Sequence, residues 1–357
     1  MTATRSPGPA LAVVGATGAA GAALLRILST RADLWSSTRL IASSRSAGRR
    51  MAVRGAETEV LALTEDAFDG LGAGDVALFL TPAAVSARWA PVAVARGVAV
   101  VDQSAAFRED PDVPLVVPEI NGYAARVRPR GIVAGPDCVT AAMMAAVGAL
   151  HAELTLAELT VSSYQAAGAA GRAGTDVLRR QLAAVAGAEL GEQPGDVRRA
   201  VGEDTGPFAA PLALNVVPWS GELREGGWSS HELAIRAESR RILGLPALPV
   251  SVTCVQVPVV TGHSLTVRAR FASAADPARA REVLEAAPGV VLVDDPAAGE
   301  FPTPADAAGT DPAWVGRLRG SLDDPRSLEF FVCADNLRRG AALNGAQIAE
   351  LIARECA

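Results

Sequence analysis

The chain has 357 residues, of which half are hydrophobic and a fifth are charged, so it can form one large domain or two ordinary ones around a buried core. All 33 basic residues are arginine, which excludes enzymes that need a lysine amine, such as pyridoxal-phosphate and Schiff-base enzymes. The formal net charge of −6 argues against a general nucleic-acid or membrane-surface binder.

The first 135 residues alternate between short apolar runs and helical stretches. The apolar runs predict buried strands at 11–14, 40–43, 76–80, 98–102 and 131–134, and residues 19–28 predict the first helix. Such alternation is typical of a parallel sheet with helices on both faces. A further helix is expected at 141–150.

From about residue 155 the runs become longer and more alternating. Strands predicted at 156–164, 250–260 and 264–271 suit a half-exposed mixed or antiparallel sheet. Helices are expected at 171–185, 229–243 and 340–354, and surface loops at 186–206 and 297–311. The sequence therefore predicts an α/β protein whose parallel sheet is followed by a mixed one.

The cysteines and histidines are too few and too widely spaced for a zinc site. No two cysteines form a CxxC pair. The cysteines are Cys138, Cys254, Cys333 and Cys356, and the histidines are His151, His231 and His263. Small buried cysteines are typical of a reducing compartment. Because glycine or proline interrupts the uncharged stretches 7–25 and 242–267, we interpret neither as a signal peptide or a membrane helix. We expect a cytoplasmic protein without a metal.

A glycine-rich segment follows the first predicted strand and opens the first helix. Gly15, Gly18 and Gly21, with Thr17 among them, allow a tight turn and let a pyrophosphate approach the helix N-terminus, whose N–H groups favour an anion. The pattern predicts nucleotide binding, with a plain tight turn as the alternative.

The end of the second predicted strand indicates which nucleotide binds. An NAD site would place an acidic residue there, but this strand runs into Ser43-Ser44-Arg45-Ser46. A guanidinium and hydroxyls suit a 2′-phosphate, so we expect NADP. The alternative is a solvated Arg45 in a loop.

Cys138 stands between a predicted strand and a predicted helix, where a helix N-terminus would stabilise a thiolate. His263 follows another strand in the turn Thr261-Gly262-His263-Ser264, where an imidazole would be presented rather than buried. The two are a candidate nucleophile and acid/base pair, although a buried structural cysteine explains Cys138 equally well.

Seven segments spread over nearly the whole chain form a recognisable set. They are VVGATGAAG (13–21), ASSRSAGRR (42–50), FREDPDVPLVVPEIN (107–121), PDCVT (136–140), SYQAAGAAGRAG (163–174), GHS (262–264) and DNLRRGAALNGAQIAE (335–350). With these segments the chain resembles the aspartate-semialdehyde dehydrogenase family. The N-acetyl-glutamyl-phosphate reductases have the same scheme of motifs, but DPDVPLVVPE and DNLRRGAALN resemble the aspartate-semialdehyde branch.

The resemblance implies a fold and an activity. It implies a doubly wound Rossmann domain over 1–137, completed by a helix within 335–357, and an α+β catalytic and dimerisation domain with a mixed sheet over 138–334. The implied reaction is NADP-dependent reductive dephosphorylation of an acyl phosphate, L-aspartyl-4-phosphate, to an aldehyde. The implied partners are these small molecules, phosphate and further copies of the chain, as a homodimer or homotetramer.

The resemblance also implies roles for single residues. The nucleophile is Cys138, the acid/base His263 and the residue that orients the intermediate Gln165. Substrate contacts come from Arg108 (phosphoryl group), Glu232 (amino group) and position 256. The cofactor contacts are Gly15, Thr17, Gly18, Gly21, Ser43, Arg45 and Asn336.

The chain departs from the family near the substrate. Gln256 replaces an arginine that binds the substrate carboxylate, and Ala234 replaces a lysine, with Arg236 as a candidate substitute. Asp137 adds a negative charge beside the nucleophile, which opposes a thiolate unless it is compensated. Two hypotheses follow: an active oxidoreductase, on aspartyl phosphate or on an acyl phosphate or thioester without that carboxylate, or a non-catalytic paralogue that binds NADP.

Overall fold

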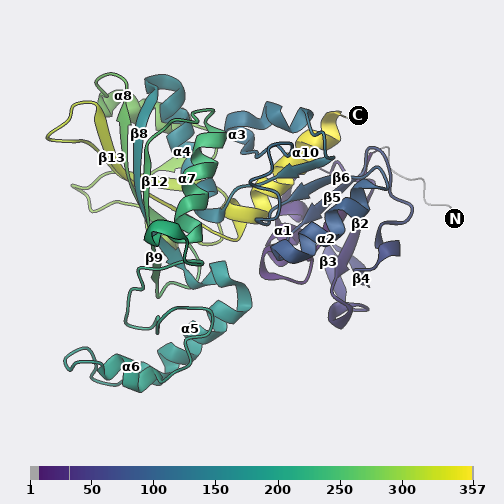
Figure 1. Ribbon diagram of the computed structural model, residues 1–357, viewed down its shortest axis with the longest axis horizontal. Helices are drawn as coiled ribbons and strands as arrows, with labels where there is room; N and C mark the ends of the chain where they lie inside the picture. Colours follow the sequence, from purple (N-terminus) through teal and green to yellow (C-terminus); the bar gives the residue numbers. More distant parts are fainter. Residues whose placement is uncertain (1–7, 32, 356–357) are drawn as a thin grey trace. The chain divides into compact units, whose positions relative to one another are not determined.

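A computed structural model describes residues 8–31 and 33–355, so Cys356 lies outside the described residues. The chain folds into two compact units (Figure 1). The first runs up to Asp137 and resumes at Gly340, and the second is Cys138–Arg339. No helix in the described ranges is long and apolar enough to cross a membrane.

The first unit contains a seven-stranded sheet in the order β3-β4-β2-β1-β5-β6-β7. All neighbours are parallel except β3 and β4. The central strands are buried because they consist of Ala, Val, Leu, Ile and Phe. The strands are β1 (Ala10–Val14), β2 (Ser37–Ala42), β3 (Arg50–Val53), β4 (Ala56–Ala62), β5 (Val76–Phe79), β6 (Ala99–Asp102) and β7 (Ile132–Ala134).

The antiparallel pair β3 and β4 was not expected from the sequence. Arg54 and Gly55 join the strands in a two-residue turn in which both residues have positive φ, as such hairpins require. The pair is largely exposed and carries charged side chains, so it lacks the apolar run that marks the other strands.

Two helices of this unit, α2 (Ala83–Val94) and α10 (Asn344–Glu355), pack against the middle of the sheet. The unit also contains α1 (Ala19–Thr30) and α3 (Pro118–Asn121). α2 and α10 both contact β5 and β6, and α10 also contacts α1. A bidentate ion pair between Arg31 and Glu350 joins the end of α1 to α10 at 2.5 and 2.7 Å. The helix expected at 340–354 thus begins at Asn344, after a π-helical segment, Arg338–Leu343.

The second unit contains a six-stranded sheet in the order β11-β12-β13-β10-β8-β9. Its two outer pairs are parallel and its inner pairs antiparallel, so the expected mixed sheet is confirmed, together with the parallel α/β sheet before it. Its strands are β8 (Leu156–Ala166), β9 (Val250–Val257), β10 (His263–Phe271), β11 (Val290–Leu292), β12 (Ala313–Gly320) and β13 (Ser327–Ala334).

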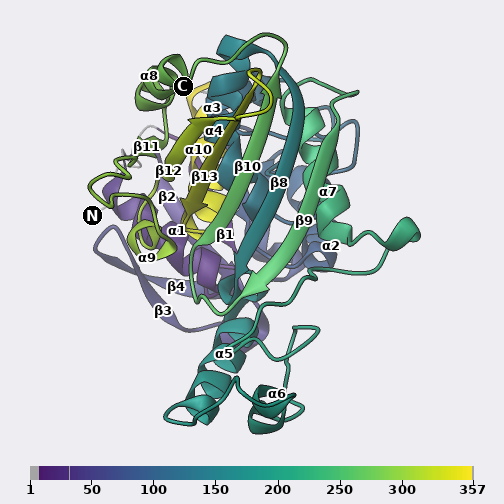
Figure 2. The same cartoon turned by 90° about the vertical axis from the view of Figure 1, so that its left-hand side faces the viewer.

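Helices cover one face of this second sheet. α4 (Cys138–Leu154) contacts β8, β10, β12 and β13, with α7 (Ser230–Ile242) and α8 (Pro277–Ala286) beside it. The first four turns of α4 are almost wholly buried, because this helix carries small and apolar side chains on all of its faces. The opposite face, seen in Figure 2, carries the exposed side chains of Thr160, Thr266 and Arg268.

An arm extends from the end of β8. It contains α5 (Gly171–Val185), as predicted, and α6 (Asp196–Val201), which lies within the expected surface loop. A small core of Val177, Leu178, Phe208 and Leu212 holds the arm together. The other expected loop contains the single-turn helix α9 (Pro304–Ala307).

Candidate active site

Cys138 and His263 meet although 125 residues separate them. Cys138 is the first residue of α4, and its Sγ lies 3.1 Å from Nε2 of His263. A half-buried cysteine at a helix N-terminus is placed to form a thiolate. His263 is fully buried as the first residue of β10, so the expectation that it lies in a turn was wrong. The turn ends at Gly262, whose φ of +104° suits glycine.

A backbone group sets the tautomer of the neutral His263 ring. The N–H of Ala166 donates to Nδ1 at 3.0 Å, so Nδ1 carries a lone pair. The hydrogen of the neutral imidazole therefore lies on Nε2, which faces Sγ. In this tautomer His263 donates a hydrogen bond to the sulfur, an arrangement that favours the thiolate.

Two glutamines lie side by side near this pair. Gln165 in β8 and Gln256 in β9 are register partners in adjacent parallel strands, so their side chains share one face of the sheet. Gln165 is buried, and its neighbour Ala166 holds the His263 ring. The side chain of Gln256 is partly exposed and forms no hydrogen bond with the described residues.

Glu232 is held firmly at the start of α7. One carboxylate oxygen accepts the N–H of Ser229 at 2.8 Å, as part of a capping box. The other accepts the N–H of Cys254 in β9 at 3.1 Å. Each oxygen keeps a free lone pair, so the carboxylate could still accept a substrate ammonium.

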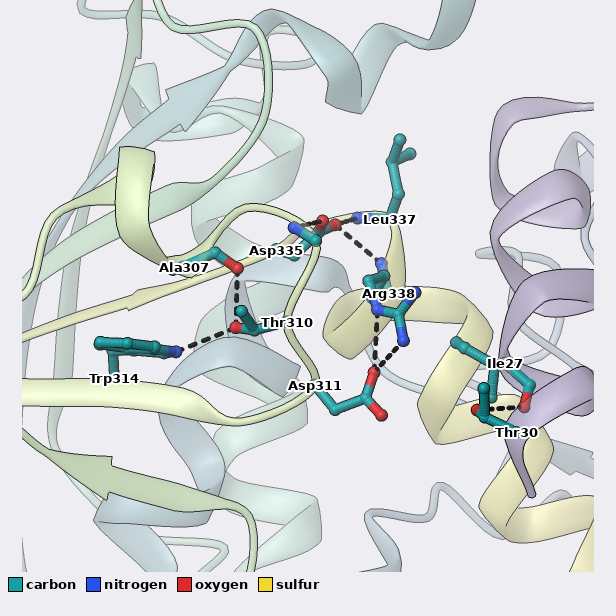
Figure 3. Close-up of polar contacts among 10 residues, drawn as sticks. Ile27, Thr30, Ala307, Thr310, Asp311, Trp314, Asp335, Leu337 and Arg338 are labelled. Atoms are coloured by element: carbon teal, nitrogen blue, oxygen red, sulfur yellow. Dashed lines mark hydrogen bonds and ion pairs between the residues drawn. The ribbon is translucent and has the colours of Figure 1, made fainter. Parts of the chain in front are cut away.

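Asn336 supports the turn before His263. Its Oδ1 accepts the N–H of Gly262 at 3.0 Å, and its side chain is buried. The preceding residue, Asp335, accepts the N–H groups of Leu337 and Arg338 with one oxygen, as Figure 3 shows. Its other oxygen accepts the N–H of Gly309.

Arg108 organises the segment that leads into α4. Its guanidinium donates to the carbonyl oxygens of Gly135 and Gln103 at 3.0 and 2.9 Å and lies 3.5 Å from the Asp137 carboxylate. The negative charge that Asp137 adds beside the nucleophile is therefore paired with a positive one. The planar fork of a guanidinium matches the geometry of a phosphoryl group.

The glycine segment before α1 forms a close-packed turn. A Cβ at Gly15 would lie 2.4 Å from the Leu80 carbonyl oxygen, and one at Gly21 would lie 2.3 Å from the Gly15 oxygen. Gly18 is the N-cap of α1, and no side chain caps this helix. Its first N–H groups are therefore open to an anion.

Side chains at the carboxyl ends of the parallel strands fit a nucleotide. Thr17 donates to Ser46 at 3.2 Å, which joins the glycine turn to the turn that begins at Ser43. Arg45 is exposed there and forms no ion pair with any described residue. After β6, the buried amide of Gln103 has no hydrogen-bond partner among the described residues. An orphaned amide and an open helix end at this edge fit a bound dinucleotide.

Comparisons with known proteins identify the family. Two family models match, described as "Semialdehyde dehydrogenase, NAD binding domain" over residues 10–127 and "Semialdehyde dehydrogenase, dimerisation domain" over residues 147–339. The aspartate-semialdehyde dehydrogenase of Corynebacterium melassecola is 44% identical over 96% of this chain and 99% of that protein. The chain belongs to the aspartate-semialdehyde dehydrogenase family.

Other members of the aspartate-semialdehyde dehydrogenase family agree with this. The Streptomyces akiyoshiensis enzyme is 42% identical over 96% of this chain and 98% of its own. A crystal structure of aspartate semialdehyde dehydrogenase II from Vibrio cholerae, complexed with ASA, matches with a TM-score of 0.90 and 33% identity, covering 98% and 99% of the two chains. The chain is therefore an oxidoreductase with a domain for a nucleotide cofactor, and the family resemblance in its sequence is confirmed.

The structure adds two polar side chains that sequence reasoning missed. Ser220 contacts Gln165 and His231, both at 2.9 Å. No local pattern marks Ser220, which lies in irregular chain 55 residues from Gln165.

Arg236, the candidate substitute for the lysine missing at position 234, lies near the opposite end of β9 from Gln256. It lines a surface hollow with Glu158, Arg240 and Pro249, at the beginning of β9. Gln256 lies six residues further along this strand from Val250, or about 20 Å.

The remaining described cysteines are structural. Cys254 and Cys333 are fully buried. Burial and the nearby negative charge of Asp306 raise the pKa of the Cys333 thiol to about 12, so it stays protonated. No group of three potential metal-ligating side chains comes together in residues 8–31 and 33–355.

Proposed function

We propose that this chain catalyses the NADP-dependent reductive dephosphorylation of L-aspartyl-4-phosphate to L-aspartate 4-semialdehyde through a thioester on Cys138. The observation that carries the proposal is the 3.1 Å contact between Cys138 and a buried His263 whose Nε2–H faces the sulfur. Membership in the aspartate-semialdehyde dehydrogenase family supports the substrate.

The chain's own groups account for the covalent steps. The Cys138 thiolate attacks the acyl carbon, the carbon–oxygen bond to the phosphoryl group breaks, and phosphate leaves with the electron pair. Negative charge develops on the carbonyl oxygen during the attack. Its hydrogen-bond donors would be the backbone N–H groups in the first turn of α4 and the side-chain N–H of Gln165. Bound NADPH would supply the hydride that brings the acyl group to the aldehyde level.

The remaining groups bind the substrate and release the product. When the carbon–sulfur bond breaks, the sulfur returns as a thiolate that accepts the hydrogen bond from Nε2–H of His263. The acid/base role of His263 would be exercised through this Nε2 proton. Glu232 would bind the substrate ammonium, Arg108 the phosphoryl group and the amide of Gln256 the far end of the substrate.

We assign the domains accordingly. The first unit, about residues 1–137 with the final helix, binds NADP. The proposed NADP contacts are Gly15, Thr17, Gly18, Gly21, Ser43, Arg45 and Asn336. The second unit carries catalysis and dimerisation.

The proposed reaction is tested by NADPH absorbance, with NADP⁺, phosphate and L-aspartate semialdehyde. We expect turnover that Cys138→Ala abolishes while NADP still binds, and Cys333→Ala is the matched control because its buried thiol stays protonated. Turnover that survives in Cys138→Ala would reject the nucleophile. Absent turnover with intact NADP binding would favour another acyl substrate or a non-catalytic paralogue.

A different acyl group is the second candidate, because the Gln256 amide has no positive charge for a carboxylate. On that alternative, Gln256→Arg raises turnover of aspartate semialdehyde, since a guanidinium binds a carboxylate bidentately. A loss of activity in Gln256→Arg would count against it.

The choice of NADP over NAD is tested at Arg45. We expect Arg45→Ala to weaken NADP binding about tenfold and leave NAD binding unchanged, because only NADP carries the 2′-phosphate. Calorimetric titration of both nucleotides measures this. An equal loss for both would place Arg45 away from the phosphate.

A further inference from the structure

The Gln165 amide belongs to a chain of hydrogen bonds that leads away from the catalytic pair. The Ser220 hydroxyl donates to Oε1 of Gln165 at 2.9 Å and lies 2.9 Å from Nδ1 of His231. On its other side, Nε2 of Gln165 donates to the Ser163 hydroxyl at 3.2 Å. Gln165, Ser220 and Ser163 are all buried, so water does not satisfy these groups.

The count of hydrogens gives this chain a direction. A hydroxyl has one hydrogen, and Ser220 gives it to Gln165. Ser220 must therefore accept from His231, whose Nδ1 carries a hydrogen. The amide of Gln165 is held with its oxygen toward Ser220, and the second hydrogen on Nε2 forms no hydrogen bond with the described residues.

The backbone around Ser220 is fixed from the side of the sheet. Val217 forms two backbone hydrogen bonds with Gln256, at 2.8 and 3.0 Å. Gln256 is the register partner of Gln165 in the neighbouring strand. Ser220 therefore lies only three residues after Val217, whose backbone is bonded to the strand beside Gln165.

The backbone is also fixed from the side of α7. Gly221 turns with a φ of +90°, and a Cβ there would lie 2.3 Å from the Ser230 hydroxyl oxygen and 3.1 Å from the His231 ring. Glu222 and Ser230 then exchange hydrogen bonds at 2.8 and 2.9 Å. Ser220 is thus held between the strand that carries Gln165 and the helix that carries His231.

We propose that Ser220 and His231 are positioning residues that hold the Gln165 amide with its N–H, rather than its oxygen, available to the reacting acyl group. The inference rests on the proposed function, in which Gln165 orients the acyl intermediate. If the amide turned over, its carbonyl oxygen would take the place of the N–H and would repel the oxyanion that develops in the transition state. An Nδ1–H on His231 disfavours that orientation, because the hydrogen of the buried Ser220 hydroxyl would then have no acceptor among its two partners, Gln165 and His231.

The kinetic test uses single and double variants of the hydrogen-bonded pair Ser220 and His231, which we call the relay. We expect Ser220→Ala to lower kcat about tenfold with little change in KM, because the amide loses its preferred orientation in the transition state. Ser220→Thr keeps the hydroxyl and should retain most activity. His231→Phe should lower kcat several-fold, and the double variant should be no worse than Ser220→Ala, because both residues act through one hydrogen bond.

The outcomes separate positioning from structural damage. Ser239→Ala is the matched control, since it removes a buried serine hydroxyl that bonds only within α7. Effects of Ser220→Ala and His231→Phe that multiply in the double variant would overturn the relay. So would an unchanged kcat in Ser220→Ala, or a Ser220→Thr variant as impaired as Ser220→Ala.

A second readout does not depend on turnover, so it separates failure of the relay from failure of the proposed reaction. In the ¹⁵N-histidine NMR spectrum of the whole protein, with signals assigned through the variants His151→Gln, His231→Phe and His263→Asn, we expect His231 to carry its hydrogen on Nδ1. We expect Ser220→Ala to change that signal and leave the signal of His263 in place. An Nδ1 of His231 without hydrogen would overturn the inference even if the wild-type chain proved inactive.

Discussion

The residues around Cys138 combine features that individually oppose and favour a thiolate. Asp137 brings a negative charge next to the sulfur in the chain, and the Arg108 guanidinium pairs with that charge at 3.5 Å. His263 approaches the sulfur with its Nε2–H because the Ala166 amide occupies the other ring nitrogen. The sulfur therefore faces a hydrogen-bond donor at the N-terminus of α4, while Cys333 stays a buried thiol.

A residue-scale prediction concerns Asp102 at the end of β6. Burial raises the pKa of its carboxyl group above the ordinary value of 3.8, although hydrogen bonds from Ser104 and Ser86 oppose the shift. The folded chain then holds this proton more tightly than the unfolded chain. The contribution to stability is complete below pH 3.8 and is lost as the pH rises through the raised folded pKa.

Asp102→Asn should remove that dependence, because an amide does not ionise. We expect the urea midpoint of Asp102→Asn, minus that of the wild type, to increase as the pH rises from below the ordinary pKa of Asp to neutrality. Urea unfolding of both proteins at several pH values measures the gain. A difference that stays constant with pH would contradict the raised pKa.

At the scale of elements, α7 connects helix capping to the proposed substrate site. Ser229 caps the helix by accepting the N–H of Glu232, and Glu232 in turn accepts the Ser229 N–H. The same carboxylate is the proposed ligand of the substrate ammonium. The capping box that begins α7 therefore also orients the carboxylate proposed to bind the substrate.

Ser229→Ala should weaken both functions of that cap. We expect the free energy of unfolding to fall by about 1 kcal/mol and the KM for the substrate to rise, because the Glu232 side chain loses part of its support. Ser229→Thr keeps the capping oxygen and should restore both values. Chemical denaturation and steady-state kinetics are the measurements, and a KM that stays constant in Ser229→Ala would separate the cap from binding.

Elements with strong local signals could be predicted from the sequence. The five buried parallel strands, the glycine turn before α1 and the bounds of α5 follow from apolar runs, glycines and helical periodicity. The exposed pair β3 and β4 lacks an apolar run, and strands β11, β12 and β13 were not predicted. Residue type and position made Cys138 and His263 a candidate pair, but the sequence alone could not show that they meet. Nothing local indicated Ser220, because its contacts join distant parts of the chain.

At the scale of the whole molecule, the chain passes between its two units at Asp137–Cys138 and again at Arg339–Gly340. The proposed nucleophile is thus the first residue of the second unit. That unit also presents a sheet face that α4, α7 and α8 do not cover, with a shallow hollow of about 390 Å³ among Thr266, Arg268 and Phe331. We propose that this face pairs with a second copy of the chain, as the dimerisation-domain match suggests.

The oligomer is tested by light scattering coupled to size-exclusion chromatography. We expect a mass of at least twice the 36.5 kDa of one chain for the wild type. Thr266→Arg should shift the mass toward one chain, because it places a large charged group beside Arg268 at the centre of the open face. A monomeric wild type, or an unchanged mass in Thr266→Arg, would contradict pairing through this face.

The most direct test of the central claim, a thioester on Cys138, is a single turnover without phosphate. Purified protein is mixed with NADP⁺ and L-aspartate semialdehyde, NADPH absorbance is followed, and the masses of the whole protein and of its proteolytic peptides are measured after acid quenching. We predict a stoichiometric burst of NADPH and an aspartyl acyl group attached to the peptide that contains Cys138, with neither in Cys138→Ala. A burst that persists in Cys138→Ala, or an acyl group on another residue, would contradict the account.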